Sequence, residues 1–375
     1  MPVDTVNLGH RIASVRRLAG FTQEQLARAS GMERSAIAKI ETGARGVTAL
    51  ELAGLARVLD HRIEWFFEEP APSIVSHRNT SDPGEPSPRI DGALERIARA
   101  VEFTAEHDRD LLELLRTASV PAFEEAAAAA DVEESARRAR TFLGLERDEP
   151  LYEMSSKLAA AGVLSFVMEL GTESADAGSL LLRSGAVALV NGSLRTGRRR
   201  LALAHEFGHV LLADEYSIDW RVNATKLERE RFLDRFARTL LLPAGSLQKQ
   251  WWDSGGDDPH RLREAAVRTA SRFRVDMSTL ARRLAELELV EPETSGAVRN
   301  FRTQRSDIVH YDLLVADELP AGEMPREYEA AVLRLFTSET VSEERALDLL
   351  LGGWTPDELP ALPVRSEAEI WQFVS

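Results

Sequence analysis

The chain of 375 residues contains no cysteine, which excludes disulfide frameworks and thiolate metal sites. Any metal site must therefore use histidine and carboxylate ligands. No apolar run approaches the roughly 20 residues that a membrane-spanning helix needs. The first 20 residues hold three arginines and no continuous apolar stretch, so they do not predict a secretory signal. We therefore expect a cytoplasmic protein with no membrane partner.

The chain also lacks an excess of positive charge. Its formal net charge is −15, which argues against a protein that coats nucleic acid non-specifically. The charge is uneven, however, because residues 1–67 carry nine lysines and arginines against seven acidic residues, whereas the rest carries −17. A small near-neutral domain attached to an acidic body can still bind DNA through one local basic face.

Composition and periodicity predict a soluble globular chain of two or three domains. Short apolar runs at 163–167 and 186–190 predict strands, and most other segments have helical periodicity. We therefore expect a mostly helical α+β protein: an all-α amino-terminal domain, then a small β-sheet packed on helices, then a helical carboxy-terminal tail. The expected boundaries are an amino-terminal domain at 1–69, a proline-rich linker at 70–90, a helical segment at 91–144, a central domain at 145–295 and a carboxy-terminal region at 296–375.

The amino-terminal segment has the pattern of a helix-turn-helix. Thr22 and Gln25 have the spacing of a capping box, Gly31 provides a tight turn, and a further helix begins near Glu33 and ends at Gly43. This geometry lays the second helix of the pair in the major groove of DNA, although periodicity alone fits any small helical bundle. The candidate DNA contacts are Gln23, Arg34, Ser35, Lys39 and Arg45.

The residue pattern adds to this periodicity. The segments 20–27 (GFTQEQLA) and 37–45 (IAKIETGAR) resemble the Cro/CI-type helix-turn-helix of the XRE family, over about residues 8–67. Ala38 departs from the family pattern, which usually has serine there. The resemblance implies binding to a double-stranded DNA operator, and a palindromic operator implies a homodimer. The alternative is a helix-turn-helix retained only as an interaction module.

The most specific chemical signal is the HExxH pattern formed by residues 205–209. His205 and His209 lie one helical turn apart and point the same way, so both can bind one Zn²⁺. Glu206 then lies beside the water on the metal and can act as general base. Two solvated surface histidines are the alternative, but the flanking residues are apolar on nearly all sides, which predicts a buried helix. Buried histidines need polar partners, and a metal supplies them.

A catalytic zinc needs a third protein ligand and leaves its fourth position for water. The acidic candidates that follow the HExxH pattern are Asp214, Glu215, Asp219, Glu228, Glu230 and Asp234. Glu230 shares the apolar face of the next predicted helix, which makes it the preferred ligand. Two histidines and one glutamate also permit Mn²⁺.

The same region resembles the ImmA/IrrE family of zincin-type metallopeptidases over about residues 145–295. The resemblance rests on residues 200–209 (RLALAHEFGH) and 230–243 (ERFLDRFARTLLLP). In the family the second pattern is E-x-x-A-N-x-F-A-x-x-L-L-M-P, and its glutamate is the third metal ligand, a position that Glu230 matches. Leu233, Asp234 and Leu242 depart from that pattern. The resemblance implies a zinc endopeptidase that cleaves helix-turn-helix repressors.

Three weaker signals complete the set of candidates. His310 and Tyr311 are possible oxyanion stabilisers, because zincins often use histidine or tyrosine in that role. Residues 186–191 are either an edge strand that pairs with an extended substrate or an ordinary core strand that ends at Asn191. Arg198–Arg200 is expected to be a solvated turn.

We therefore expect a DNA-binding transcription regulator with a zinc endopeptidase domain that cleaves a repressor or itself in a stress or phage-linked response. The first alternative is a non-proteolytic regulator, or an antitoxin, whose metal domain senses a ligand or partner. The second is a purely structural metal domain, which predicts that chelation unfolds residues 145–295.

Overall fold

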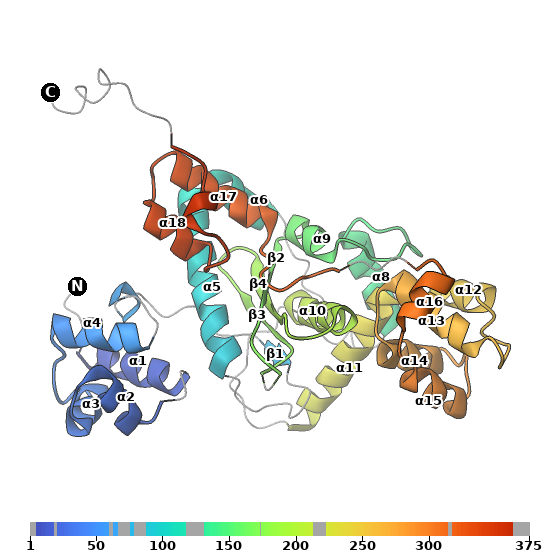
Figure 1. Ribbon diagram of the computed structural model, residues 1–375, viewed down its shortest axis with the longest axis horizontal. Helices are drawn as coiled ribbons and strands as arrows, with labels where there is room; N and C mark the ends of the chain where they lie inside the picture. Colours follow the sequence, from blue (N-terminus) through green and yellow to red (C-terminus); the bar gives the residue numbers. More distant parts are fainter. Residues whose placement is uncertain are drawn as a thin grey trace, which may run out of the picture.

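The computed structural model describes residues 5–18, 21–59, 63–66, 76–78, 88–117, 131–172, 174–212, 223–313 and 317–362. These residues form helices around one small sheet, and the predicted α+β class is confirmed (Figure 1). None of the described helices is both long enough and apolar enough to cross a membrane. Residues 118–130 of the expected helical segment at 91–144 lie outside the described residues.

The amino-terminal helices enclose a core of their own. The elements are α1 (Thr5–Leu18), α2 (Gln23–Ser30), α3 (Arg34–Glu41), α4 (Ala49–Val58) and the 3₁₀ helix η1 (Ile63–Phe66). Ile12, Leu26 and Ile37 are completely buried between them. The predicted capping box is present, with the Thr22 hydroxyl accepting from the Gln25 amide at 3.2 Å.

The sheet has four strands in the order β1-β3-β4-β2. They are β1 (Ser76–Arg78), β2 (Val163–Met168), β3 (Ala177–Leu181) and β4 (Ala186–Asn191). β2 pairs with β4 in parallel, whereas β3 is antiparallel to both β4 and β1. The sequence predicted β2 and β4 but neither β1 nor β3. β1 lies inside the interval 70–90 that was expected to be only a linker.

The remaining elements are helices. They are α5 (Pro88–His107), α6 (Arg109–Thr117), α8 (Val132–Phe142), α9 (Met154–Ala160), α10 (Thr196–Leu211), α11 (Asn223–Leu241), α12 (Ala244–Asp253), α13 (Leu262–Phe273), α14 (Met277–Glu286), α15 (Pro292–Asn300), α16 (Arg305–His310), α17 (Arg326–Thr337), α18 (Glu343–Leu349) and the 3₁₀ helix η2 (Pro356–Glu358). The first residues of α5 also belong to the interval expected to be a linker.

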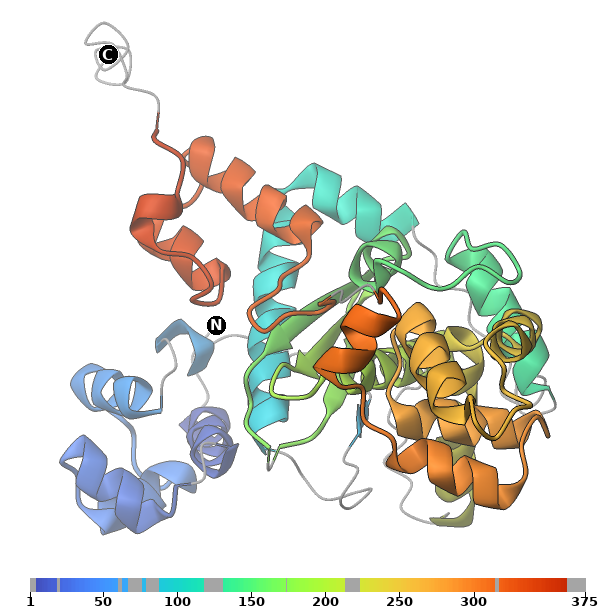
Figure 2. The same ribbon diagram turned by 45° about the vertical axis from the view of Figure 1, so that its right-hand side comes forward.

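The sheet separates two hydrophobic cores. Along β4, Ala186 and Ala188 face the core that contains α10 and α11, whereas Val187 and Leu189 face the core that contains α5 and α17. This alternation follows from the two-residue period of a strand, and apolar residues on both faces explain why β4 is a continuous apolar run. Figures 1 and 2 show α5 on one side of the sheet and α10 on the other.

The expected boundaries at 144 and 296 do not follow these cores. Both α5 and α17 pack on the second face of the sheet, so segments from both flanks of the 145–295 interval complete its core. Arg334 on α17 makes a two-pronged ion pair with buried Asp108, at 2.7 and 2.8 Å. The carboxy-terminal helices are therefore part of the body that holds the sheet.

Candidate metal centre

Helix α10 carries the HExxH residues through the middle of the protein. All residues from Arg199 to Leu211 are buried, as expected from the apolar flanks of the pattern. His205, Glu206 and His209 are between 0 and 3% exposed. The expectation of a solvated turn at Arg198–Arg200 is wrong, because these residues lie in the first turns of α10. Arg199 and Arg200 are buried there and pair with Asp317 and Glu318, respectively.

The close approach of α11 to α10 brings a carboxylate to the two histidines. Gly208 faces α11, where an added Cβ atom would lie 2.7 Å from Leu233 and 3.0 Å from Phe236. The absence of a side chain at Gly208 therefore lets the two helices pack closely. Two turns before Ala237, which is fully buried, α11 presents Glu230 toward the histidines.

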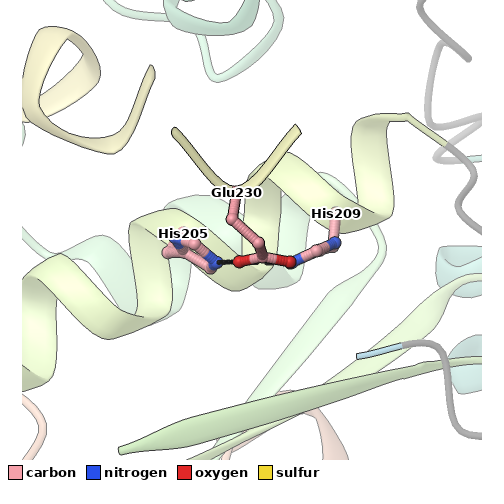
Figure 3. A group of neighbouring side chains, drawn as sticks. All are labelled: His205, His209 and Glu230. Carbon is pink, nitrogen blue, oxygen red and sulfur yellow. Dashed lines mark hydrogen bonds and ion pairs between the residues drawn. The ribbon is translucent and has the colours of Figure 1, made fainter. Parts of the chain in front are cut away.

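His205, His209 and Glu230 form one compact group of three donors, all within 4.8 Å of one another. The carboxylate of Glu230 lies between the two rings (Figure 3). Its oxygens are 3.3 Å from His205 Nε2 and 3.8 Å from His209 Nε2, and the two Nε2 atoms are 3.2 Å apart. Ligands held at 2.0–2.1 Å in a tetrahedron around zinc are about 3.3 Å apart, so the three donors fit such an ion.

A second acidic residue of α11 orients the first histidine. Asp234 Oδ1 lies 3.2 Å from His205 Nδ1, the ring nitrogen that faces away from the group of three. A carboxylate at this position fixes the ring and directs the Nε2 lone pair toward a metal. The sequence makes Asp234 a candidate ligand, and the structure gives it this supporting contact instead.

The other acidic candidates are not part of the group. Glu228 is exposed at the beginning of the described side chains of α11. Asp214, Glu215 and Asp219 lie outside the described residues. Among the described residues, Glu230 is therefore the carboxylate that the structure brings to both histidines.

Glu206 is completely buried and is held at one of its two oxygens. Ser179 on β3 donates a hydrogen bond to Glu206 Oε2 at 2.7 Å. Glu206 Oε1 is buried, with no hydrogen-bond partner among the described residues. A buried carboxylate oxygen without a donor is costly, so this atom is suited to a water or a substrate group that enters the site.

Two opposing effects act on the carboxyl group of Glu230. Burial alone would raise its pKa, but the hydrogen bond from His205 and the charges of His209 and His205 outweigh burial, so the net pKa is lowered. The shift favours the ionised form of Glu230. An ionised carboxylate is the form that binds a divalent cation.

No sequence pattern marks Ser179 as a residue of the site. β3 has the sequence AGSLL, which is short and contains a glycine, so it has no clear strand pattern. Within β3, Ala177 faces the α10 core and Leu180 faces the opposite core. Period-two alternation then directs Ser179 to the α10 side, but this argument needs the strand to be recognised first.

Two weaker candidates lie elsewhere. Residues 186–191 form β4, which is flanked by β3 and β2, so its backbone has no free edge for a substrate. Asn191 instead binds the loop backbone at Leu170 and Gly171. His310 is exposed and Tyr311 packs under Arg268 of α13, with 5.0 Å between the guanidinium carbon and the ring centre. No contact among the described residues joins either to the metal centre, so the oxyanion expectation gains no support.

The predicted DNA-contacting residues gather around α3. Arg34, Ser35 and Lys39 are exposed on that helix, as a recognition helix requires. Gln23 is half-buried and donates to Glu41 at 2.7 Å, and Arg45 pairs with Glu51 at 2.6 Å. The last two side chains thus have partners within the domain, whereas the α3 side chains present polar groups to solvent.

Comparison with protein-family models identifies two parts of the chain. The model described as helix-turn-helix matches residues 12–66. The model described as IrrE N-terminal-like domain matches residues 161–285, which include His205, Glu206, His209 and Glu230. A comparison with curated proteins found no significant match.

Proposed function

The chain is a fusion of an XRE-type helix-turn-helix domain with an IrrE/ImmA-like domain of the metallopeptidase type, and we propose that it is a DNA-binding transcription regulator with a working endopeptidase site. The observation that carries the proposal is the group of His205, His209 and Glu230 beside a buried Glu206. Three donors leave one position of a tetrahedral ion open, which is the arrangement of catalytic rather than structural zinc sites.

Each residue has a distinct role in this proposal. His205, His209 and Glu230 hold the ion, for which Zn²⁺ is our first choice and Mn²⁺ the alternative. A bound ion would supply Lewis acidity and would lower the pKa of a water molecule that it binds. Glu206 takes the proton of the attacking water at Oε1 and delivers it to the leaving amide nitrogen. Ser179 holds the other oxygen of Glu206, which leaves Oε1 as the oxygen that would accept the proton.

The DNA-binding domain restricts both the location of this site in the cell and the proteins that it can cleave. We propose that the exposed face of α3 binds a double-stranded operator in the cytoplasm, as a homodimer where the operator is palindromic. The substrate is then a helix-turn-helix repressor or the chain itself, cleaved in a stress or phage-linked response. Cleavage separates a DNA-binding domain from the part that regulates it.

The test is a comparison of new protein termini in cells that express wild type or Glu206→Gln, in normal growth and under stress. Gln has the shape of Glu but cannot accept the proton, so termini formed by this site should occur only with wild type. Arg282→Ala, on the exposed surface of α14, is the control and should give the wild-type set. Identical termini in all three strains would contradict proteolysis and favour a ligand-sensing regulator or an antitoxin.

A further inference from the structure

A short strand from the segment between the two domains occupies one edge of the sheet. β1 pairs antiparallel with β3, with Ser76 opposite Ser179, His77 opposite Gly178 and Arg78 opposite Ala177. β1 is described on its own, between η1 of the DNA-binding domain and α5 of the body. The contact is therefore made by the chain that joins the DNA-binding domain to the peptidase-like domain.

This edge is the one beside the proposed general base. Ser76 is paired with Ser179, and the hydroxyl of Ser179 binds Glu206 at 2.7 Å. β1 also contacts α10, the helix that carries both histidines. An extended peptide in the place of β1 would thus pair directly with β3, the strand whose Ser179 binds Glu206.

The opposite edge of the sheet is closed by a different segment. The Val167 amide of β2 donates to the Glu323 carbonyl, and the Gly322 amide donates to the Val167 carbonyl, both at 2.9 Å. This segment leads directly into α17, which is anchored in the second core. Within the described part of the chain, both sheet edges are therefore paired, and β1 is the partner at the β3 edge, the edge that carries Ser179.

We propose that β1 is a resident competitor of protein substrates: the interdomain segment docks on the β3 edge in the way an extended substrate would, and a substrate must displace it. The competition with a substrate rests on the proposed function, whereas the docking of β1 on β3 does not. Backbone pairing at a sheet edge accepts many sequences, because the main chain supplies most of the hydrogen bonds. A segment tethered at both ends has an effective concentration on the order of millimolar, which is enough to exclude a weakly bound peptide.

The variant that tests this is Ser76→Pro with His77→Pro. Successive amides of a strand point to opposite sides, so one of two neighbouring residues donates to β3, and proline at both removes that donor in either register. The matched control is Ser76→Ala with His77→Ala, which changes the same side chains but keeps both amides. Replacing residues 76–78 by Gly-Ser-Gly is a second disrupting variant, for use if the double-proline chain does not fold.

The probe is a fluorescein-labelled peptide of residues 73–82 (SIVSHRNTSD), added to each full-length chain in a Glu206→Gln background so that it is not cleaved. Fluorescence anisotropy should show at least about tenfold tighter binding to the double-proline variant than to the wild-type sequence or the alanine control, because tethered competition is lost. Amide hydrogen exchange should show that the peptide slows exchange within 177–181 in that variant.

Equal peptide affinity for the three chains, or protection at a site other than β3, would overturn the proposal. Circular dichroism and the thermal midpoint must match wild type for the variant used. The two hypotheses fail separately. Peptide docking without Glu206-dependent cleavage would reject proteolysis alone, whereas Glu206-dependent cleavage without peptide docking on β3 would reject the resident strand alone.

Discussion

Ser179 on β3 donates a 2.7 Å hydrogen bond to Glu206 on α10, and both side chains are completely buried. Ser179→Ala would leave both oxygens of Glu206 without a donor among the described residues. Removing one partner of a buried charged hydrogen bond costs about 1–3 kcal/mol. We expect a loss of that size in the free energy of unfolding, measured by urea denaturation. The loss should disappear in a Glu206→Leu background, where no carboxylate remains.

Ser165 provides a matched control for this prediction. It is a buried serine of the same sheet, and its hydroxyl lies 2.9 Å from that of Ser155. Both partners are neutral, so Ser165→Ala should cost less, about 0.5–1.5 kcal/mol, and should be insensitive to Glu206→Leu. A Ser179→Ala loss that persists in the Glu206→Leu background would contradict the proposed coupling.

The second prediction concerns the orientation of His205 by Asp234. Asp234→Asn keeps the shape of the side chain but weakens its pull on the ring, so zinc affinity should fall by about 10–100-fold. Glu230→Gln should lower affinity further, because it removes a charged ligand. Glu228→Gln, an exposed site on the same helix, is the control and should bind zinc as wild type does. Calorimetric titration of metal-free protein with zinc measures all four chains; equal affinities for wild type and Glu230→Gln would reject the ligand assignment.

The third prediction concerns the contact between α10 and α11. A methyl group at Gly208 would lie 2.7 Å from Leu233, so Gly208→Ala should destabilise the protein by about 1–3 kcal/mol through overpacking and displace Glu230. Leu233→Ala removes the clashing atoms. The double variant should therefore lose less free energy of unfolding than the two single variants lose together. Urea denaturation of the four chains gives this coupling. A coupling near zero would show that Leu233 does not limit the approach of α11.

The Gly208 contact also shows what could be predicted from the sequence. The HExxH spacing fixes two histidines on one helical face, because the 3.6-residue period is local. Glu230 lies 25 positions after His205. Its assignment as the third ligand needed two further observations: its place on the apolar face of the next predicted helix and its match to the family pattern. Leu233, a departure from that pattern, is accommodated because it packs beside Gly208, a fit that depends on how α10 and α11 pack in three dimensions.

The features that could not be predicted all depend on distant parts of the chain. β1 is three residues long, and its pairing with β3 is set about 100 residues away, so the prolines around it predicted only a linker. The arginines at 199 and 200 looked solvated because their acceptors, Asp317 and Glu318, belong to the far carboxy-terminal region. Charged residues are usually exposed, and an acidic partner that lies more than 100 residues away is not visible in the local sequence pattern.

The fourth prediction concerns DNA recognition by α3. Arg34→Ala should cost about 1–3 kcal/mol of operator affinity and relax specificity at one base, because arginine reads guanine with two hydrogen bonds. Lys39→Ala should weaken binding to all sequences alike and lower the salt dependence, as expected for a phosphate contact. The operator is first selected with the full-length wild-type chain from random duplexes, and affinities are then measured at several salt concentrations. The control is Arg282→Ala, and unchanged binding by Arg34→Ala would move the interface away from α3.

The last prediction concerns the carboxy-terminal helices and pH. The hydrogen bonds and charge of Arg334 hold the pKa of Asp108 below its usual value near 4, although burial acts in the opposite direction. A lowered folded-state pKa stabilises the protein above the unfolded-state pKa, and that stability is lost as the pH falls below about 4 through the folded-state pKa. Asp108→Asn should therefore lower the free energy of unfolding by about 1 kcal/mol at pH 7, a modest loss because Arg334 is partly exposed. At pH values below the folded-state pKa the substitution should lower it by almost nothing.

Asparagine preserves the other role of this residue. Asp108 Oδ1 accepts from the Leu111 amide at 2.9 Å, and asparagine caps a helix equally well, so the substitution isolates the ion pair with α17. Asp110→Asn is the matched control, because Asp110 is 77% exposed and lies 3.8 Å from Arg334. Urea denaturation from pH 7 down to pH 3 should show a difference in the free energy of unfolding between wild type and Asp108→Asn that becomes smaller as the pH falls. Asp110→Asn should show no such difference from wild type. A difference in the free energy of unfolding that stays constant with pH would show that the charge of Asp108 does not stabilise the packing of α17 on the sheet-bearing body.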